Sequence, residues 1–178
     1  MKSRKSSITN AFANSILPMP VKATFEEVEE ALAILGMDFE SVVCAYCGNP
    51  KTEWDHLRPL VVNHRPTGYI SEIANLVPSC AKCNQSKGNW EWKKWVLNPN
   101  ADNSPTKRGV KDIAERIMRL EAYERWRTPV RIEFEKILDP DLWANYWTLW
   151  DEINTDLAKC LEVAHTLRKR VIESLSSK

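Results

Sequence analysis

Four cysteines in two Cys-x-x-Cys pairs are the residues of this 178-residue chain that most clearly indicate chemistry. The pairs are Cys44 with Cys47 and Cys80 with Cys83. Thiolates at this spacing are typical of a structural zinc site with four protein ligands. Because such a site leaves no open position for a substrate, we expect one zinc ion that holds the chain together and takes no part in catalysis.

Four polar residues that could take part in catalysis lie between the two cysteine pairs or directly after the second pair. Asp55 and His56 are adjacent and stand between the two pairs, Asn75 precedes the second pair, and Asn84 follows it directly. Histidine is a suitable general base near neutral pH. Carboxylate and amide oxygens suit a hard cation such as Mg²⁺, which keeps several of its waters. Such groups can activate water and stabilise negative charge on a phosphate.

Three stretches of the sequence together resemble the motif of the HNH endonucleases. They are residues 44–47, 54–60 and 75–88, so that the resemblance covers residues 43–88, about a quarter of the chain. Its specificity comes from the agreement of many positions in type and order. The resemblance implies a ββα-metal fold, in which a β-hairpin and a helix hold one catalytic divalent cation. It also implies cleavage of phosphodiester bonds in nucleic acid.

The resemblance implies a role for each polar residue of the motif. His56 is the expected general base, and Asp55 and Asn84 are the expected ligands of Mg²⁺ or a similar cation. Asn75 is expected to brace the hairpin and to help orient the histidine. Lys87 and Arg58 are candidate contacts with DNA. His64 is a weaker alternative to His56 as the base, and it is also a candidate DNA contact.

The hairpin raises a geometrical question. We expect one strand from Trp54 to Val62 and a second from Gly68 to Ile73, joined by a loop over 63–67 rather than by a tight turn. Neighbours in a flat strand point to opposite faces, so Asp55 and His56 can serve one site only if the strand is distorted. His56 and Asn75 are 19 residues apart, a longer separation than the resemblance implies. The added loop makes His64, Arg65 and Tyr69 candidate DNA contacts.

The flanking segments are expected to be mainly helical. Thr24 to Glu27 form a capping box for a helix that Gly36 ends. Residues 1–20 are interpreted as a frayed terminus or as an arm that touches DNA or a second subunit. We therefore predict an α+β chain that is mostly helical, with an N-terminal arm and helix at 1–40, the ββα-metal core at 41–97, and a C-terminal helical region at 98–178.

One long helix is predicted near the C-terminus, from Asp139-Pro140 to about Leu175. Apolar residues at alternating spacings of three and four form a heptad seam along it, with Cys160 as a core position. The seam either packs on its own domain or forms a subunit interface. A nuclease with one site per chain that cuts both strands favours a homodimer.

The composition is that of an ordered protein, and its nearly balanced charge is only a weak indication of nucleic-acid binding. The chain carries 25 Lys and Arg against 24 Asp and Glu. Residues 44–95 have a small positive excess, with 7 basic and 4 acidic side chains. Lys107, Arg108 and Lys111 are candidate phosphate contacts, with ordinary solvated charges as the alternative. Five cysteines, an odd number, do not suggest a disulfide framework, and we expect a cytoplasmic protein.

Three functions remain open from the sequence. The favoured one is a metal-dependent endonuclease of restriction or defence that hydrolyses double-stranded DNA to 5′-phosphate and 3′-hydroxyl ends. The second is a zinc-containing nucleic-acid-binding module that does not cleave. The third is a nuclease that acts on RNA or as a toxin.

Overall fold

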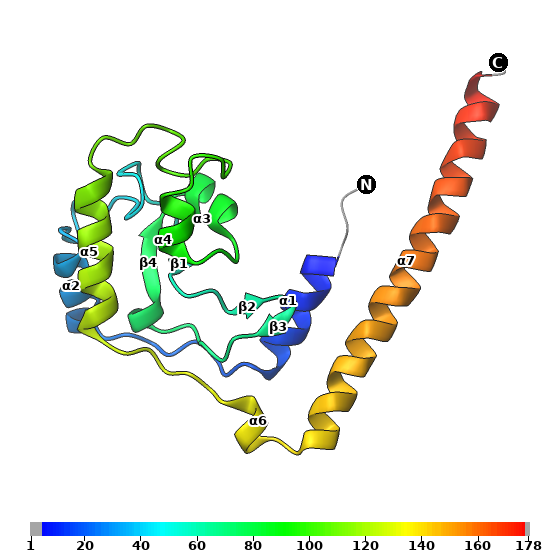
Figure 1. Cartoon of the computed structure of the whole chain (residues 1–178), viewed down its shortest axis with the longest axis horizontal. Coiled ribbons are helices and arrows are strands. Elements are labelled where there is room, and N and C mark those ends of the chain that lie inside the picture. Colours follow the sequence, from blue (N-terminus) through cyan, green and yellow to red (C-terminus); the bar gives the residue numbers. More distant parts are fainter. Residues whose placement is uncertain (1–4, 177–178) are drawn as a thin grey trace. The chain divides into compact units, whose positions relative to one another are not determined.

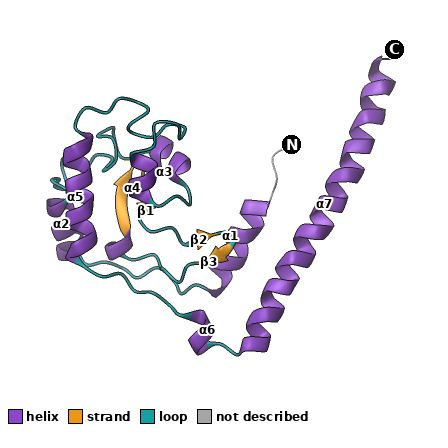
Figure 2. Ribbon diagram, in the orientation of Figure 1, coloured by secondary structure: helices purple, strands orange, loops and turns teal. Residues whose placement is uncertain are grey.

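The computed structural model describes residues 5–176, whose elements are drawn in Figures 1 and 2. The chain divides into two compact units. One is Ile16–Ile132, and the other joins the segment up to Ser15 to Glu133–Lys178. The first unit contains α2 (Phe25–Ile34), β1 (Glu53–His56), β2 (Val61–Val62), β3 (Arg65–Pro66), the 3-10 turn η1 (Ile73–Asn75), β4 (Leu76–Ser79), α3 (Ala81–Lys87), α4 (Trp92–Val96) and α5 (Ile113–Trp126).

The ββα core consists of β1, β4 and α3. β1 pairs antiparallel with β4, so that Asp55 lies opposite Val77 and His56 opposite Leu76. α3 follows β4 after a single residue and contacts β1, which brings the start of the helix to the hairpin. The predicted α+β fold, mostly helical with a ββα core beside four clustered cysteines, is confirmed.

The strand boundaries differ from the prediction in a way that matters for the site. The first strand ends at His56 instead of Val62, and its partner is Leu76–Ser79 instead of Gly68–Ile73. The backbone N–H and C=O of Arg58 are both bonded by the side chain of Asn75, so this residue cannot continue a ladder. Pro59 then lacks a backbone N–H altogether. The hairpin is therefore short, and a long connection, residues 57–75, separates its strands; this segment is called the excursion below.

That excursion contains a second, tight hairpin of β2 and β3. Val61 lies opposite Pro66 and Val62 opposite Arg65, which leaves only Asn63 and His64 in the turn. Both turn residues have positive φ, 50° and 63°. Two consecutive left-handed residues are what a two-residue hairpin turn requires. The prediction of a loop without a tight hairpin is thus wrong, because asparagine and histidine tolerate a conformation usually left to glycine.

The helices α2 and α5 pack beside the hairpin and enclose the core of this unit (Figure 2). Thr24 caps α2 with a complete capping box, as predicted. Ala31, Leu32 and Leu35 are buried and lie on one face of the helix and its C-terminal end. The core continues through residues of the first cysteine pair, the β1–β4 hairpin, α4 and α5, among them Tyr46, Leu57, Val77, Trp92, Trp95, Leu120 and Tyr123.

The second unit contains most of α1 (Lys5–Ile16), with α6 (Phe134–Ile137) and α7 (Pro140–Ser176). Residues 5–16 form a helix, which corrects the interpretation of 1–20 as an arm; residues 1–4 lie outside the described part. Tertiary contacts stabilise it, because the Trp150 indole donates to Thr9 and the Tyr146 hydroxyl donates to the carbonyl of Phe12. Both Thr9 and Ala13 are buried.

α7 begins at the predicted proline and runs for 37 residues, which confirms the long helix. Its first turns carry Trp143, Trp147 and Trp150, whose rings pack in succession on one another. From Ile153 onward its apolar residues are partly or fully exposed. Cys160 is exposed and is not a core residue, because no described element covers this part of the seam. None of the helices among residues 5–176 is both long and apolar enough to cross a membrane.

Candidate active site and zinc site

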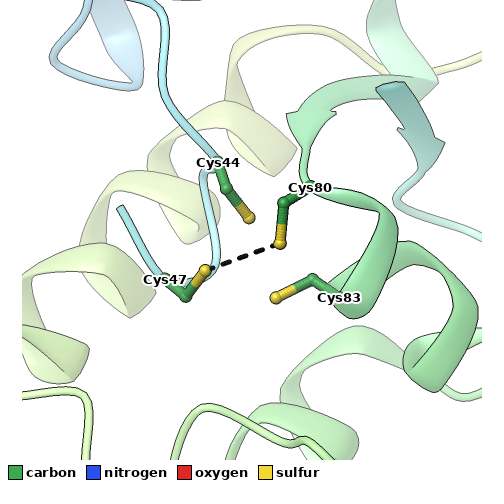
Figure 3. A group of neighbouring side chains, drawn as sticks. All are labelled: Cys44, Cys47, Cys80 and Cys83. Carbon is green, nitrogen blue, oxygen red and sulfur yellow. Dashed lines mark hydrogen bonds between the residues drawn. The ribbon is translucent and has the colours of Figure 1, made fainter. Parts of the chain in front are cut away.

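The four cysteines meet at one point beside the hairpin, as Figure 3 shows. Their sulfur atoms all lie within 4.8 Å of one another, and Cys47 Sγ is 3.8 Å from Cys80 Sγ. Four sulfurs bound 2.3 Å from a central zinc ion form a tetrahedron with edges of about 3.8 Å. The spacing therefore fits zinc with four thiolate ligands, the donor set expected from the sequence.

Short turns present the thiolates of both pairs. The backbone N–H groups of Cys47 and Gly48 both donate to the carbonyl of Cys44, at 3.3 and 2.8 Å. Gly48 adopts a φ of 73°, which the turn needs. The second pair lies at the start of α3: Cys80 is the N-cap residue, and Cys83 lies in the first turn of the helix, which begins at Ala81.

Arg108 lies against the sulfur cluster, although the sequence had it only as a candidate for phosphate. Its guanidinium Nη2 is 3.0 Å from Cys83 Sγ. A zinc ion with four thiolates has a net charge of −2, so a neighbouring cation offsets part of that charge. The spacing of 25 residues between Arg108 and Cys83 gives no local signal by which sequence could find this contact.

Asp55 is buried against α3 and is bonded from two directions. The Tyr46 hydroxyl donates to Oδ2 at 2.5 Å, and the Lys87 ammonium lies 3.0 Å from the same oxygen. Burial raises the pKa of Asp55 and lowers that of Lys87, while each partner's charge acts against the burial effect. The ion pair and the hydrogen bond from Tyr46 therefore compensate a carboxylate that burial alone would neutralise.

Lys87 does not face solvent, where a phosphate contact would place it. Its side chain is fully buried. Besides pairing with Asp55, the ammonium donates to the carbonyl of His56 at 2.7 Å. Lys87 thus joins α3 to the end of β1, at the two residues expected to perform the chemistry. The candidate DNA contact at Lys87 is thus a buried ammonium that is bonded to groups of the protein itself.

His56 is half-buried, and its ring contacts a different segment from Asp55. Nε2 lies 2.7 Å from the hydroxyl of Ser71, in the excursion before η1. Burial, and secondly the charge of Lys87, lower the pKa of His56 from 6.5 to about 4. The ring is therefore neutral at pH 7 and retains the lone pair that a general base needs. Nothing in the motif spacing pointed to Ser71.

The two asparagines occupy different positions. Asn75 is fully buried and bonds the strand end from both sides: Oδ1 accepts from the N–H of Arg58 at 2.8 Å, and Nδ2 donates to its carbonyl at 3.0 Å. Asn84 lies on α3, where its amide donates to the carboxylate of Glu53. Glu53 was not among the predicted residues. It could have been found from the period of two along a strand, which puts it on the same face as Asp55.

Two of the predicted DNA contacts, His64 and Arg65, lie in the second hairpin, and two others, Arg58 and Tyr69, contact each other. His64 is exposed in its turn, and Arg65 donates to the carbonyl of His64. The guanidinium groups of Arg58 and Arg131 lie 5.8 and 5.9 Å from the centre of the Tyr69 ring. Arg58 also forms an ion pair of 3.2 Å with Glu124.

Comparison with known proteins agrees with this geometry. Residues 44–89 match the sequence model of the HNH endonuclease family. The chain is 27% identical over 174 residues to the CRISPR-associated endonuclease Cas9 of Corynebacterium diphtheriae. That match covers 86% of this chain but only 15% of the Cas9, so the chain spans a small part of the relative's length. No solved structure gives a significant match. A ββα hairpin, a neutral histidine beside a buried aspartate and four clustered cysteines thus coincide with the segment that matches the HNH endonuclease model.

Proposed function

We propose that this chain is a metal-dependent endonuclease that hydrolyses double-stranded DNA to 5′-phosphate and 3′-hydroxyl ends, in restriction or defence. The observation that carries the proposal is His56, a neutral imidazole at the end of β1, next to the buried Asp55 and within an HNH domain. A phosphodiester hydrolase needs such a base for its water.

Oxygen donors on β1 and α3 are of the kind that a hard divalent cation binds. Asp55 Oδ2 is bonded by Tyr46 and Lys87, whereas Oδ1 lies 3.4 Å from the Lys87 ammonium; a carboxylate oxygen has two lone pairs, so Oδ1 can still offer one to a cation. The carbonyl oxygen of Asn84 and the carboxylate of Glu53 lie together on the α3 side of the hairpin. Mg²⁺ bound by Asp55 and Asn84 would supply positive charge for the phosphate and the leaving oxygen.

The protein's own groups divide the remaining work. His56 accepts a proton from the attacking water, while Asn75 holds the strand end that carries the ring. The Lys87 ion pair favours the ionised form of the buried Asp55, against the effect of burial on its pKa, and a carboxylate is the form that binds a cation. The zinc-type cysteine cluster fixes the start of α3, and with it Asn84, against the hairpin. We infer one structural zinc ion per chain at this cluster.

Plasmid cleavage tests the proposal. Pure protein with Mg²⁺ should convert supercoiled plasmid to nicked and linear forms, and ³¹P or end-labelling analysis should find 5′-phosphates. His56→Ala should lose at least about 100-fold in rate, the size of a general-base contribution. His165→Ala, an exposed histidine on α7 for which no catalytic or DNA-binding role is proposed, is the matched control and should cut normally.

Three outcomes would contradict it. Undiminished cutting by His56→Ala would remove the histidine from the mechanism. Plasmid that is shifted in a gel but never cut by the wild type would indicate the non-cleaving zinc module. Cleavage of RNA in preference to duplex DNA would indicate the RNA-directed or toxin-type nuclease.

We also propose that the chain acts as a homodimer, because one active site per chain must act on two strands. The exposed apolar seam of α7 supports this, since an unpacked stripe of that length needs a covering partner.

A further inference from the structure

The hydroxyl of Ser71 lies against the ring of His56. The distance from its Oγ to Nε2 is 2.7 Å, well inside hydrogen-bonding range, although the residues are 15 positions apart. Ser71 belongs to the long excursion between the paired strands β1 and β4. A hydroxyl can donate or accept, so the bond by itself fits either neutral form of the imidazole.

The role of a general base decides between the two forms. A neutral imidazole carries one N–H and one lone pair, and the lone pair must face the water that loses its proton. Nε2 is held against Ser71 and could reach water only by giving up this bond. The remaining nitrogen, Nδ1, is then the basic one, and Nε2–H donates to Ser71 Oγ.

The backbone around Ser71 is fastened on several sides, so the hydroxyl is held in place. Its own carbonyl accepts the N–H of Val21 at 2.9 Å. The next residue, Glu72, accepts the N–H of Val130 with its side chain. The preceding carbonyl, of Ile70, accepts from Asn75 Nδ2 at 3.3 Å. The backbone of residues 70–72 is thus bonded by Val21, by Val130 and by Asn75 of the motif.

We propose that Ser71 is a positioning residue for His56: it accepts a hydrogen bond from Nε2–H, selects the tautomer with Nδ1 as the base, and fixes the plane of the ring. The proposal rests on the proposed function of His56. The bond also persists when the ring takes up a proton, because Nε2–H remains a donor and the bond becomes charge-assisted. A neutral hydroxyl does this without adding negative charge beside the base, as a carboxylate partner would.

The tautomer can be measured without any turnover. Long-range ¹H–¹⁵N NMR spectra of the full chain, labelled with ¹⁵N-histidine and kept free of divalent cations other than zinc, distinguish the two nitrogens. The wild type should show His56 with its proton on Nε2 at pH 7. Ser71→Ala should give a mixture of both forms, and Ser71→Thr should restore the wild-type pattern. A proton on Nδ1 in the wild type, or an unchanged tautomer in Ser71→Ala, would overturn the proposal.

Kinetics then separate positioning from folding. Ser71→Ala should lower kcat about 10-fold with little change in KM, the lower end of the effect of losing an orienting partner. Ser71→Thr should recover most of the rate. Ser41→Ala is the matched control: this serine lies in an exposed turn, distant in sequence from Ser71, and the variant should cut normally. If no protein cleaves any substrate, the nuclease proposal fails while the NMR result still decides the Ser71 bond. Equal kcat for Ser71→Ala and wild type would contradict the positioning role.

Discussion

The buried pair of Asp55 and Lys87 is the most strongly constrained contact of the site. The lysine side chain is fully buried, and the ammonium is bonded by a carboxylate and by the carbonyl of His56. Removing two charges from water is costly, and the pair is tolerated because each charge is met by the other and by further hydrogen bonds. The same contact joins α3 to β1, so it serves the geometry of the hairpin as well as the charge of Asp55.

Replacing the lysine should therefore be costly. Lys87→Met leaves Asp55 buried without its counter-charge, and should lower the free energy of unfolding by about 3–5 kcal/mol, the usual range for breaking a buried pair. Urea denaturation followed by tryptophan fluorescence measures this. Lys82→Met, an exposed lysine on the same helix, is the matched control and should change stability by less than about 0.5 kcal/mol. Equal effects of the two substitutions would mean that the pair is not important for folding.

His56 predicts a specific dependence of stability on pH. Its pKa is lowered from 6.5 to about 4, so between these values the unfolded chain binds a proton that the folded chain rejects. The contribution to stability is thus present above pH 6.5 and is lost as the pH falls towards 4. The urea midpoint should fall further between pH 7 and pH 5 in the wild type than in His56→Gln, with both proteins measured without Mg²⁺. An equal fall in both proteins would show that the ring is not held neutral.

The elements of the core are held by contacts that reach over long stretches of sequence. Arg108 illustrates this for the zinc knuckles, where it is the cation beside Cys83. Arg108→Gln should weaken zinc binding about 10- to 100-fold, as loss of a partner of metal ligands commonly does. Competition with a coloured chelator measures the affinity. Lys111→Gln, a nearby exposed cation, should leave it unchanged. Unaltered affinity in Arg108→Gln would show that the contact does not support the metal.

A substitution at Gly68 tests how closely the excursion that contains Ser71 packs against the backbone of Ile132. Its φ is 88°, and an added Cβ would meet the carbonyl oxygen of Ile132 at 2.1 Å. Gly109 also has a positive φ, 68°, but has no atom within 4 Å of an added Cβ. Gly109→Ala should cost about 1 kcal/mol, from backbone conformation alone. Gly68→Ala should cost at least twice as much by thermal or urea unfolding, because backbone must move as well. Equal costs would mean that Ile132 yields freely.

At the scale of the whole chain, α7 exposes a seam whose charges suit a second copy. Glu152, Asp156 and Glu162 lie in the earlier half of the exposed stretch, and the basic run 168–170 lies in the later half. Two such helices packed antiparallel would place unlike charges opposite each other, whereas parallel packing would align like charges. The proposed dimer is therefore expected to form through an antiparallel pair of α7 helices.

A single charge in the seam should separate the proposed dimer into monomers. Leu167 is 57% exposed and lies on the seam, while its neighbour Thr166 lies off the seam and is also exposed. Light scattering coupled to size exclusion should find a dimer for the wild type and for Thr166→Glu, and a monomer for Leu167→Glu. A wild type that stays monomeric at concentrations near 100 μM, or an equal effect of both substitutions, would contradict the interface.

The sequence by itself determined the features that depend on short spacing along the chain. The four zinc-type ligands, the capping box at Thr24 and the start of the long helix at Pro140 were readable, because local chemistry and helical or knuckle spacing encode them. The ββα order came from the resemblance of the motif to a known family. The polar residues of the motif were identified in the same way, although their roles remain predictions.

Only the tertiary structure decided which of these side chains meet. The partner strand of β1, the burial of Lys87 and the contact of His56 with Ser71 join residues 15 to 32 positions apart. Such contacts depend on how the excursion folds back and on which groups lose water, and a linear pattern records neither. The helix at residues 5–16 was missed for the same reason, since it is stabilised by aromatic residues more than 130 positions away.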